Sequence, residues 1–103
     1  MRRFIDSVQP IRVRVGEEFA VALAGNPTTG YIWQQTGAGT ECVELVAQQF
    51  EPGRHAVGAG GLEVFHFRAL QPGEARITFE HIRPWIGDPR DRKYFQVIVE
   101  PEG

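Results

Sequence analysis

The sequence predicts an all-β protein, an antiparallel β-sandwich of about seven strands. Apolar and polar residues alternate along about seven short segments, as in strands that bury one face and expose the other. Turn-forming glycines and prolines separate these segments, and no stretch has the apolar spacing of an amphipathic helix. With 103 residues, 42% of them hydrophobic, the chain suits one domain covering residues 1–103.

The alternating segments follow one another along the chain. In each, every second residue is expected to face the core, while the residues between them, including His66, face solvent. The expected core residues are Ile11, Val13 and Val15; Phe19, Val21 and Leu23; Tyr31 and Trp33; Val43 and Leu45; Phe65 and Phe67; Ala75, Ile77 and Phe79; and Phe95, Val97 and Val99. Trp33, on the third segment, matches the tryptophan that packs between the sheets of immunoglobulin-like sandwiches, so we expect an immunoglobulin-like fold.

The composition argues against two classes of partner. A net charge of -2 provides no basic surface for nucleic acid. The sequence has no apolar run near the ~20 residues that a membrane-spanning helix needs, so we expect no membrane partner. The first residues, "MRRFIDSVQP", contain no apolar stretch of the signal-peptide type. We therefore expect a cytoplasmic protein as the sequence is given, or an exported one if a signal was removed.

The residues that could support catalysis or metal binding are few. Cys42 is the one cysteine, so it has no disulfide partner in the chain, and its strand-like context favours a partly buried thiol over a nucleophile. The three histidines do not have the spacing of metal ligands. The "GAGG" segment precedes a strand and not a helix, which argues against a phosphate-binding loop. We expect no metal, no cofactor and no enzymatic activity.

Three unusual loops are expected at one end of the sandwich, because alternate connections of an antiparallel fold project from the same end. In the lettering of seven-stranded sandwiches, they are the BC loop (25–30, "GNPTTG"), the DE loop (57–61, "VGAGG") and the FG loop (83–93, "RPWIGDPRDRK"). Each could be an ordinary turn. Together they combine an uncharged tip, a glycine segment with accessible backbone, and the Arg and Trp types enriched in binding hot spots. We interpret this end as a wedge-shaped binding edge.

The three loops carry a family resemblance. "NPTTGY" at 26–31, "GAGG" at 58–61 followed by "EVFHF", and "RPW" at 83–85 resemble the signature loops of the chagasin-type inhibitors of cysteine peptidases. The resemblance extends over most of the chain. It implies an immunoglobulin-like fold and reversible inhibition of papain-like cysteine peptidases by the BC, DE and FG loops in the active-site cleft. His81 departs from the family, which often has Tyr at this position, and the departure concerns the support beneath the FG loop.

The resemblance also implies a role for individual residues. Thr28 and Thr29 would lie over the catalytic cysteine of the peptidase, the backbone of Gly60 and Gly61 would pair with the cleft wall, and Trp85 would pack on the primed side. A papain-like peptidase would be the partner of a monomeric inhibitor. The implied peptidase-binding residues are Asn26, Pro27, Thr28, Thr29, Gly30, Tyr31, Gly58, Gly60, Gly61, Arg83, Pro84 and Trp85.

Two other functions remain as alternatives at this point. In a carbohydrate-binding or adhesion sandwich, Trp85 and Tyr31 would stack on sugar rings, but such modules need exposed aromatics along a sheet face. In a structural module, the first or last strand would pair with a neighbouring domain. The charges in "IRVR" and "RDRK" make these strands poor edges for pairing.

Overall fold

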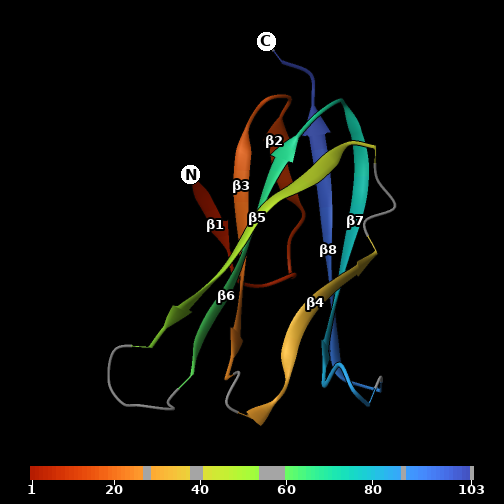
Figure 1. The fold of residues 1–103 in the computed structure, drawn as a ribbon. Coiled ribbons are helices and arrows are strands. Elements are labelled where there is room, and N and C mark those ends of the chain that lie inside the picture. The colour runs from red at the N-terminus through yellow and green to blue at the C-terminus, as the bar shows by residue number, and fades with distance from the viewer. Residues whose placement is uncertain (27–28, 38–40, 54–59, 87, 103) are drawn as a thin grey trace.

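The fold is a sandwich of two four-stranded sheets (Figure 1). The computed structural model describes residues 1–26, 29–37, 41–53, 60–86 and 88–102. One sheet has the order β1-β3-β6-β5 and the other β2-β8-β7-β4. The strands are β1 (Arg2–Phe4), β2 (Ile11–Arg14), β3 (Glu18–Gly25), β4 (Ile32–Gly37), β5 (Val43–Pro52), β6 (Gly61–Ala69), β7 (Gly73–Ile82) and β8 (Pro89–Glu100). The predicted all-β, immunoglobulin-like sandwich is confirmed.

The described chain has eight strands, one more than the sequence predicted. The additional strand, β1, has only three residues, too few for a visible alternation of apolar and polar positions. It pairs in parallel with β3, and β2 pairs in parallel with β8. The other strand pairs are antiparallel. The segment between β1 and β2 crosses from one sheet to the other, which gives the antiparallel sandwich two parallel edges.

The core lies between the sheets and is rich in phenylalanine. Phe19 stacks on Phe67 within the first sheet, with ring centroids 5.5 Å apart. The ring centroid of Phe79, in the second sheet, lies 4.8 Å from that of Phe65 and 5.7 Å from that of Phe95. Such aromatic pairs add to the stabilisation that burial of their surface provides. The predicted inward positions of β2, β3, β7 and β8 are confirmed as buried.

Two expectations about individual residues were wrong, those for Leu45 and Val64, while Val15, Tyr31 and His66 are each half-buried. Leu45 was expected in the core, but it is 40% exposed, because β5 is an edge strand with a bulge after this residue. Val64 was expected on a solvent-facing side of β6, but it is fully buried in a small cluster with Ala20 and Ala22. His66, on the same side, is half-buried, with Nδ1 3.2 Å from the sulfur of Met1. Strand β1 lies beside β3 at the edge of this sheet, and Arg3 of β1 pairs with Glu51 of β5 at 2.7 Å, across the two strands between them.

The three predicted loops leave the sandwich from the same end. Figure 1 shows the strand ends that lead into the β3–β4, β5–β6 and β7–β8 connections at the lower end of the view. Cys42 lies just before β5, towards the opposite end. It is 9% exposed, with its sulfur 3.9 Å from the carbonyl oxygens of Pro72 and Glu74, which agrees with the expected buried thiol. We name the end with the three connections the loop end.

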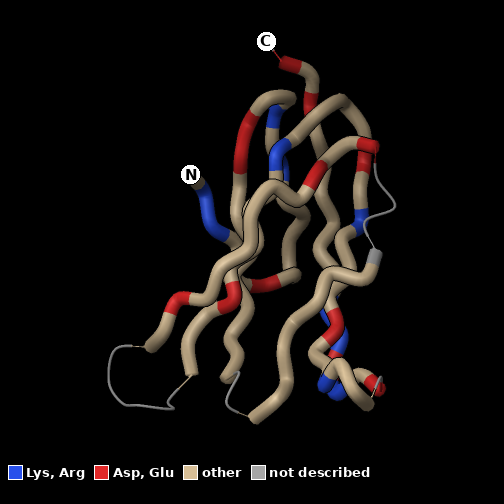
Figure 2. Tube along the Cα trace, viewed as in Figure 1, with Lys and Arg blue, Asp and Glu red and all other residues tan. Residues whose placement is uncertain are grey.

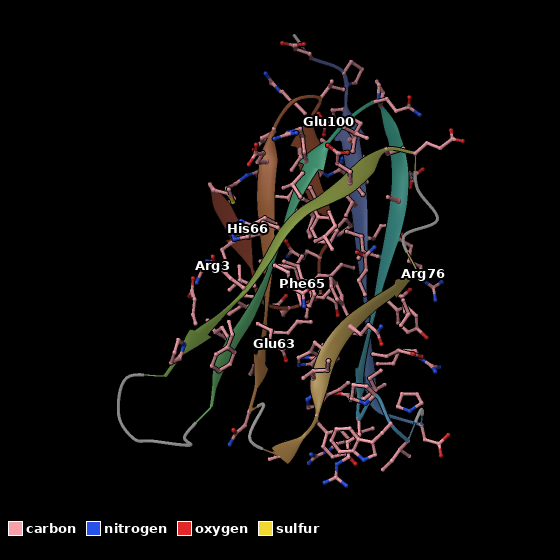
Figure 3. All side chains as sticks on the ribbon, viewed as in Figure 1. Arg3, Glu63, Phe65, His66, Arg76 and Glu100 are labelled. Carbon is pink, nitrogen blue, oxygen red and sulfur yellow. The ribbon has the colours of Figure 1, made fainter. Side chains whose placement is uncertain are left out.

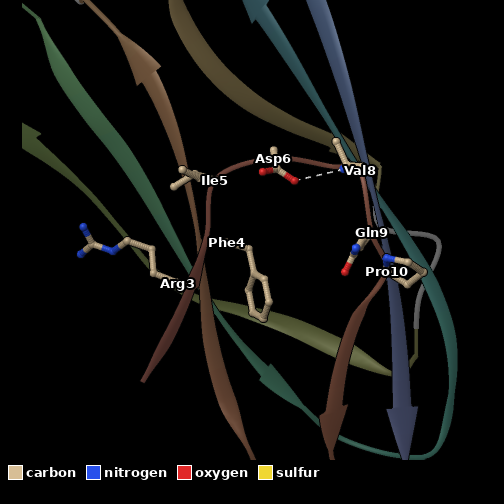
Figure 4. A pocket seen from close by; sticks show the side chains of 7 residues that line it. All are labelled: Arg3, Phe4, Ile5, Asp6, Val8, Gln9 and Pro10. Atoms are coloured by element: carbon tan, nitrogen blue, oxygen red, sulfur yellow. Dashed lines mark hydrogen bonds between the residues drawn. The ribbon is translucent and has the colours of Figure 1, made fainter.

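The segment between β1 and β2 lines an open pocket of about 450 Å³ (Figure 4). There the Asp6 carboxylate accepts a hydrogen bond of 3.2 Å from the Val8 amide. Within the residue ranges given above, no helix is long and apolar enough to cross a membrane. The same ranges contain no group of three or more His, Cys, Asp or Glu that could hold a metal ion.

Candidate functional site at the loop end

The BC loop is held by its own hydrogen bonds. The Thr29 hydroxyl donates to the Asn26 carbonyl at 2.8 Å, and the Thr29 amide donates to the same oxygen at 3.1 Å. The Tyr31 amide donates to the Thr29 hydroxyl oxygen at 3.3 Å. Gly30 has a φ of 85°, a conformation that glycine adopts without strain. The Thr-Gly pair therefore shapes the turn, while Pro27 and Thr28 lie outside the described residues.

The FG loop packs directly against the BC loop. A Cβ atom added at Gly30 would lie 2.8 Å from Cη2 of Trp85, so the indole lies directly against the glycine backbone and would have to shift for any other residue at this position. A hydrogen bond of 3.0 Å from the Ile86 amide to the Arg83 carbonyl closes the turn that carries Trp85. Trp85 remains 72% exposed, and Pro84 beside it is also exposed. The indole thus contacts the BC loop and still presents most of its surface to solvent.

Two guanidinium groups of the FG side contact the ring of Tyr31. The guanidinium carbon of Arg83 is 4.4 Å from the centroid of the Tyr31 ring, and that of Arg90 is 4.9 Å from it. Cation–π contacts of this kind contribute about 0.5–1 kcal/mol each at exposed sites. Arg83 is half-buried, and among the described residues its Nε atom has no hydrogen-bond partner. Arg83 therefore packs within the chain, joining the FG loop to the BC loop.

His81 supports both loops from below. Its ring stacks on Trp33, with centroids 4.5 Å apart and planes 11° apart, and its centroid is 5.4 Å from that of Tyr31. Burial lowers the pKa of His81 below its ordinary value, Arg90 and Lys93 lower it further, and Asp91 opposes them. The neutral ring of His81 is therefore favoured in the stack.

Trp33 and His81 also line an open hollow of about 640 Å³.

The DE loop meets the BC loop through glycine. Gly60 has a φ of 86°, and a Cβ atom there would lie 2.8 Å from the carbonyl oxygen of Gly25 and 3.4 Å from Cβ of Asn26. The Gly53 amide donates a hydrogen bond of 2.7 Å to the Gly60 carbonyl. A Cβ atom at Gly61 would overlap the Glu51 carbonyl oxygen. The backbones of the DE and BC loops are therefore in contact at Gly60 and Gly25, at a distance that leaves no room for a side chain on Gly60. Gly58 lies outside the described residues.

The described parts of the three loops thus form one continuous surface, as the sequence predicted. Gly60 contacts the start of the BC loop, and Trp85 and Arg83 contact its end. Figure 2 shows that the ends of β3 and β4 at this pole carry no charged residues, whereas charged residues lie on the β7–β8 side and, on the opposite side, near the ends of β5 and β6. Among the described residues, the centre of this surface is therefore uncharged, and the charged residues lie at its borders.

Glu63 is a residue of this region that the sequence analysis missed. It lies in β6 and is 6% exposed, and its carboxylate accepts a hydrogen bond of 3.0 Å from the Trp33 amide. Burial raises the pKa of the Glu63 carboxyl above its ordinary value, and the bond from Trp33 opposes the rise. Figure 3 shows Glu63 below Phe65 on β6, on the side facing β4. The signal was present, because Glu63 shares the parity of the inward-facing Phe65 and Phe67.

Comparison with known proteins agrees with this geometry. The chain is 32% identical to chagasin of Trypanosoma cruzi over 95 residues, which cover 87% of this chain and 86% of chagasin. The crystal structure of the cysteine protease inhibitor EhICP2 from Entamoeba histolytica aligns with a TM-score of 0.78 at 20% identity, covering 97% of each chain. PbICP-C, solved in complex with falcipain-2, aligns with a TM-score of 0.70 at 18% identity, covering 97% of this chain and 98% of PbICP-C.

The family model described as chagasin family peptidase inhibitor I42 matches residues 12–99. This range contains strands β2 to β8 apart from the first residue of β2 and the last residue of β8, and it leaves out β1. The match therefore spans the three loops and both sheets. This chain belongs to the chagasin family of peptidase inhibitors.

Proposed function

We propose that residues 1–103 act as one domain that reversibly inhibits papain-like cysteine peptidases and has no catalytic activity of its own. The observation that carries the proposal is the joining of the loops: Gly60 contacts Gly25, and Trp85 contacts Gly30. A surface built from three connected loops at one end of a sandwich is suited to the groove of a peptidase that accepts an extended peptide. The family membership and the complex of PbICP-C with falcipain-2 support the same partner class.

The BC loop would occupy the centre of the cleft, with Thr28 and Thr29 over the catalytic cysteine. This loop carries no charged residue. An unpaired charge entering a closed cleft would lose its hydration at a cost of several kcal/mol, whereas a threonine hydroxyl can exchange water for a hydrogen bond within the cleft. Asn26, Pro27, Gly30 and Tyr31 would complete this part of the interface.

The DE loop would supply backbone groups to the cleft wall. Peptidase clefts bind the main chain of their substrates, and an inhibitor segment without side chains can approach that wall closely. Gly58, Gly60 and Gly61 are suited to this approach. Pairing of this type adds affinity without demanding a particular side chain from the peptidase.

The FG loop would contribute the aromatic anchor. Trp85 is 72% exposed in the free chain, and tryptophan is the residue type that most often dominates binding energies when it fills a pocket. Pro84 fixes the backbone before it, and Arg83 holds the loop on Tyr31. Trp85 would lie on the primed side of the cleft, beside the catalytic residues.

The internal hydrogen bonds of the BC loop explain how such a loop could resist cleavage. The bonds between Thr29 and Asn26 fix its backbone as a turn before binding, so less conformational freedom is lost on association. Hydrolysis needs an extended peptide bond in attack geometry, which a fixed turn does not present. The peptidase would then be blocked and the loop left intact.

The test is a titration of papain with the purified chain, followed with a fluorogenic peptide. We expect stoichiometric loss of activity that recovers on dilution. Cys42→Ser is the control, because it should inhibit equally and so excludes a mixed disulfide with the enzyme. Full papain activity at micromolar inhibitor would overturn the proposal.

The described sheet faces do not favour the carbohydrate-binding alternative. The exposed aromatic residues of the strands are Phe50, 39% exposed on β5, and Tyr94, 40% exposed on β8, and these strands belong to different sheets. They do not form the aromatic platform that a sugar ring requires. The most exposed aromatic residue, Trp85, lies on a loop.

A further inference from the structure

We propose that Glu63 is a positioning residue that holds the DE loop in register with the BC and FG loops through Trp33, so that tight inhibition requires a hydrogen-bond acceptor at position 63. The inference rests on the proposed function. It concerns a residue that lies beneath the binding surface and would not touch the peptidase.

The place of Glu63 in the fold suits this role. It lies two residues after Gly61, where the DE loop enters β6, and it is paired with Leu23 of β3. Its carboxylate leaves the first sheet and accepts the amide hydrogen of Trp33 in the second sheet at 3.0 Å. Because β4 is an edge strand, this amide depends on a side chain for its partner.

Trp33 also contacts the strand ends that lead to the other two loops. Its indole nitrogen donates a hydrogen bond of 2.9 Å to the carbonyl of Ala24, at the end of β3 before the BC loop. Its ring stacks on His81, near the end of β7 before the FG loop, with centroids 4.5 Å apart. Trp33 is therefore bonded or stacked to the strand ends that lead to all three loops, and Glu63 supplies the connection from the DE side.

The carboxylate also restricts the entry to the BC loop. A Cβ atom at Gly25 would lie 2.9 Å from Oε2 of Glu63, so the carboxylate rests against the Gly25 backbone. Gly25 in turn contacts Gly60 of the DE loop. The same carboxylate thus contacts the residue at which the BC and DE loops meet, in addition to the Trp33 amide.

Placing a carboxylate at this buried position has an unfavourable desolvation free energy. Its burial removes water from a charged group, whereas a leucine of similar size would add apolar contact without that loss. The property that leucine lacks is a directional acceptor for the Trp33 amide. We infer that Glu63 supports inhibition because its oxygen fixes the position of the Trp33 backbone, and not because its side chain fills space in the core.

The experiment compares Glu63→Gln, which keeps an acceptor oxygen, with Glu63→Leu, which keeps the volume and loses the acceptor. Ile77→Ala is the control for lost stability, because Ile77 is fully buried in the middle of β7. Each variant is assayed for papain inhibition, for the dissociation rate of the complex and for thermal unfolding. Amide NMR spectra report the positions of Gly30, Gly60 and Trp33 in the free protein.

We expect Glu63→Gln to inhibit within about 3-fold of wild type and Glu63→Leu to bind about 10- to 100-fold more weakly, through faster dissociation. The loop amide signals should shift in Glu63→Leu and not in Ile77→Ala. Should the Leu variant not fold, Glu63→Ser replaces it, because serine is too short to reach the Trp33 amide.

The inference is overturned if the Leu or Ser variant inhibits as well as Ile77→Ala, or if Glu63→Gln fails to restore inhibition. A wild-type chain that does not inhibit papain would overturn the proposed function and this inference together. Inhibition by wild type with no effect at position 63 would overturn the inference alone.

Discussion

Gly30→Ala tests whether the contact between the BC and FG loops shapes the binding surface. Gly30 has a φ of 85°, and forcing alanine into this region costs about 1–2 kcal/mol. The same strain arises in Gly16→Ala, where φ is 88°, but no atom lies within 4 Å of the added Cβ. At Gly30 the added Cβ would lie 2.8 Å from Cη2 of Trp85. The two variants therefore share a backbone cost, and only Gly30→Ala adds contacts with the FG loop, chiefly with Trp85.

The magnitudes follow from these contacts. Both variants should lower the melting temperature by about 4–16 °C, the shift that 1–2 kcal/mol produces in a domain of this size. Relieving the contact at Gly30 requires Trp85 to move by roughly 0.5 Å or to turn away, which removes part of an anchor worth about 2–4 kcal/mol. We expect papain inhibition by Gly30→Ala to weaken about 10- to 100-fold and that by Gly16→Ala to be unchanged.

The assay is a papain inhibition constant measured well below both melting temperatures, with circular dichroism to show that each variant is folded. Equal inhibition by Gly30→Ala and Gly16→Ala would refute the idea that the BC loop sets the position of the indole. Equal weakening in both would show that inhibition follows general stability.

Three further predictions concern single side chains. Trp85→Ala should weaken papain binding by about 2–4 kcal/mol, while Tyr94→Ala, an exposed aromatic away from the loop end, should change it little; equal effects would contradict the anchor. Thr29→Val removes the hydroxyl bonded to Asn26 and should cost about 1 kcal/mol of stability in urea unfolding, with no change if that bond is dispensable. The pKa of His81 is lowered in the folded chain, so protonation favours unfolding, and wild-type stability should fall as pH drops from about 6.5 through the folded-state pKa. His81→Phe should remove this part of the pH dependence of the unfolding free energy, and an unaltered profile would contradict it.

The fold was largely predictable because each strand of a sandwich has two different faces, which the sequence records as an alternation. The errors arose where burial depends on distant parts of the chain. Val64 is buried in a cluster with Ala20 and Ala22 of the neighbouring strand β3, and Leu45 is exposed because its strand lies at an edge. Neither fact is encoded in the neighbouring residues. The strand β1 was missed for the same reason, since its pairing with β3 decides its conformation.

The site was predictable as a set of loops but not as a set of contacts. The loop motifs and the strand count placed the Thr29, Gly60 and Trp85 segments at one end. Side-chain packing decides the rest: the loop motifs do not predict that Arg83 lies on the ring of Tyr31. Glu63 could have been found, since it continues the inward parity of its strand, as His81 does in β7.

The phenylalanine core has a consequence for the conditions in which this protein can operate. A papain-like enzyme works only while its active-site thiol is kept reduced, and the same conditions open the disulfides on which many small inhibitors depend for their fold. With a single, buried cysteine, this chain is held by aromatic packing, which thiol reagents do not affect. The inhibitor should therefore keep its shape across the whole range of redox potentials at which its target is active.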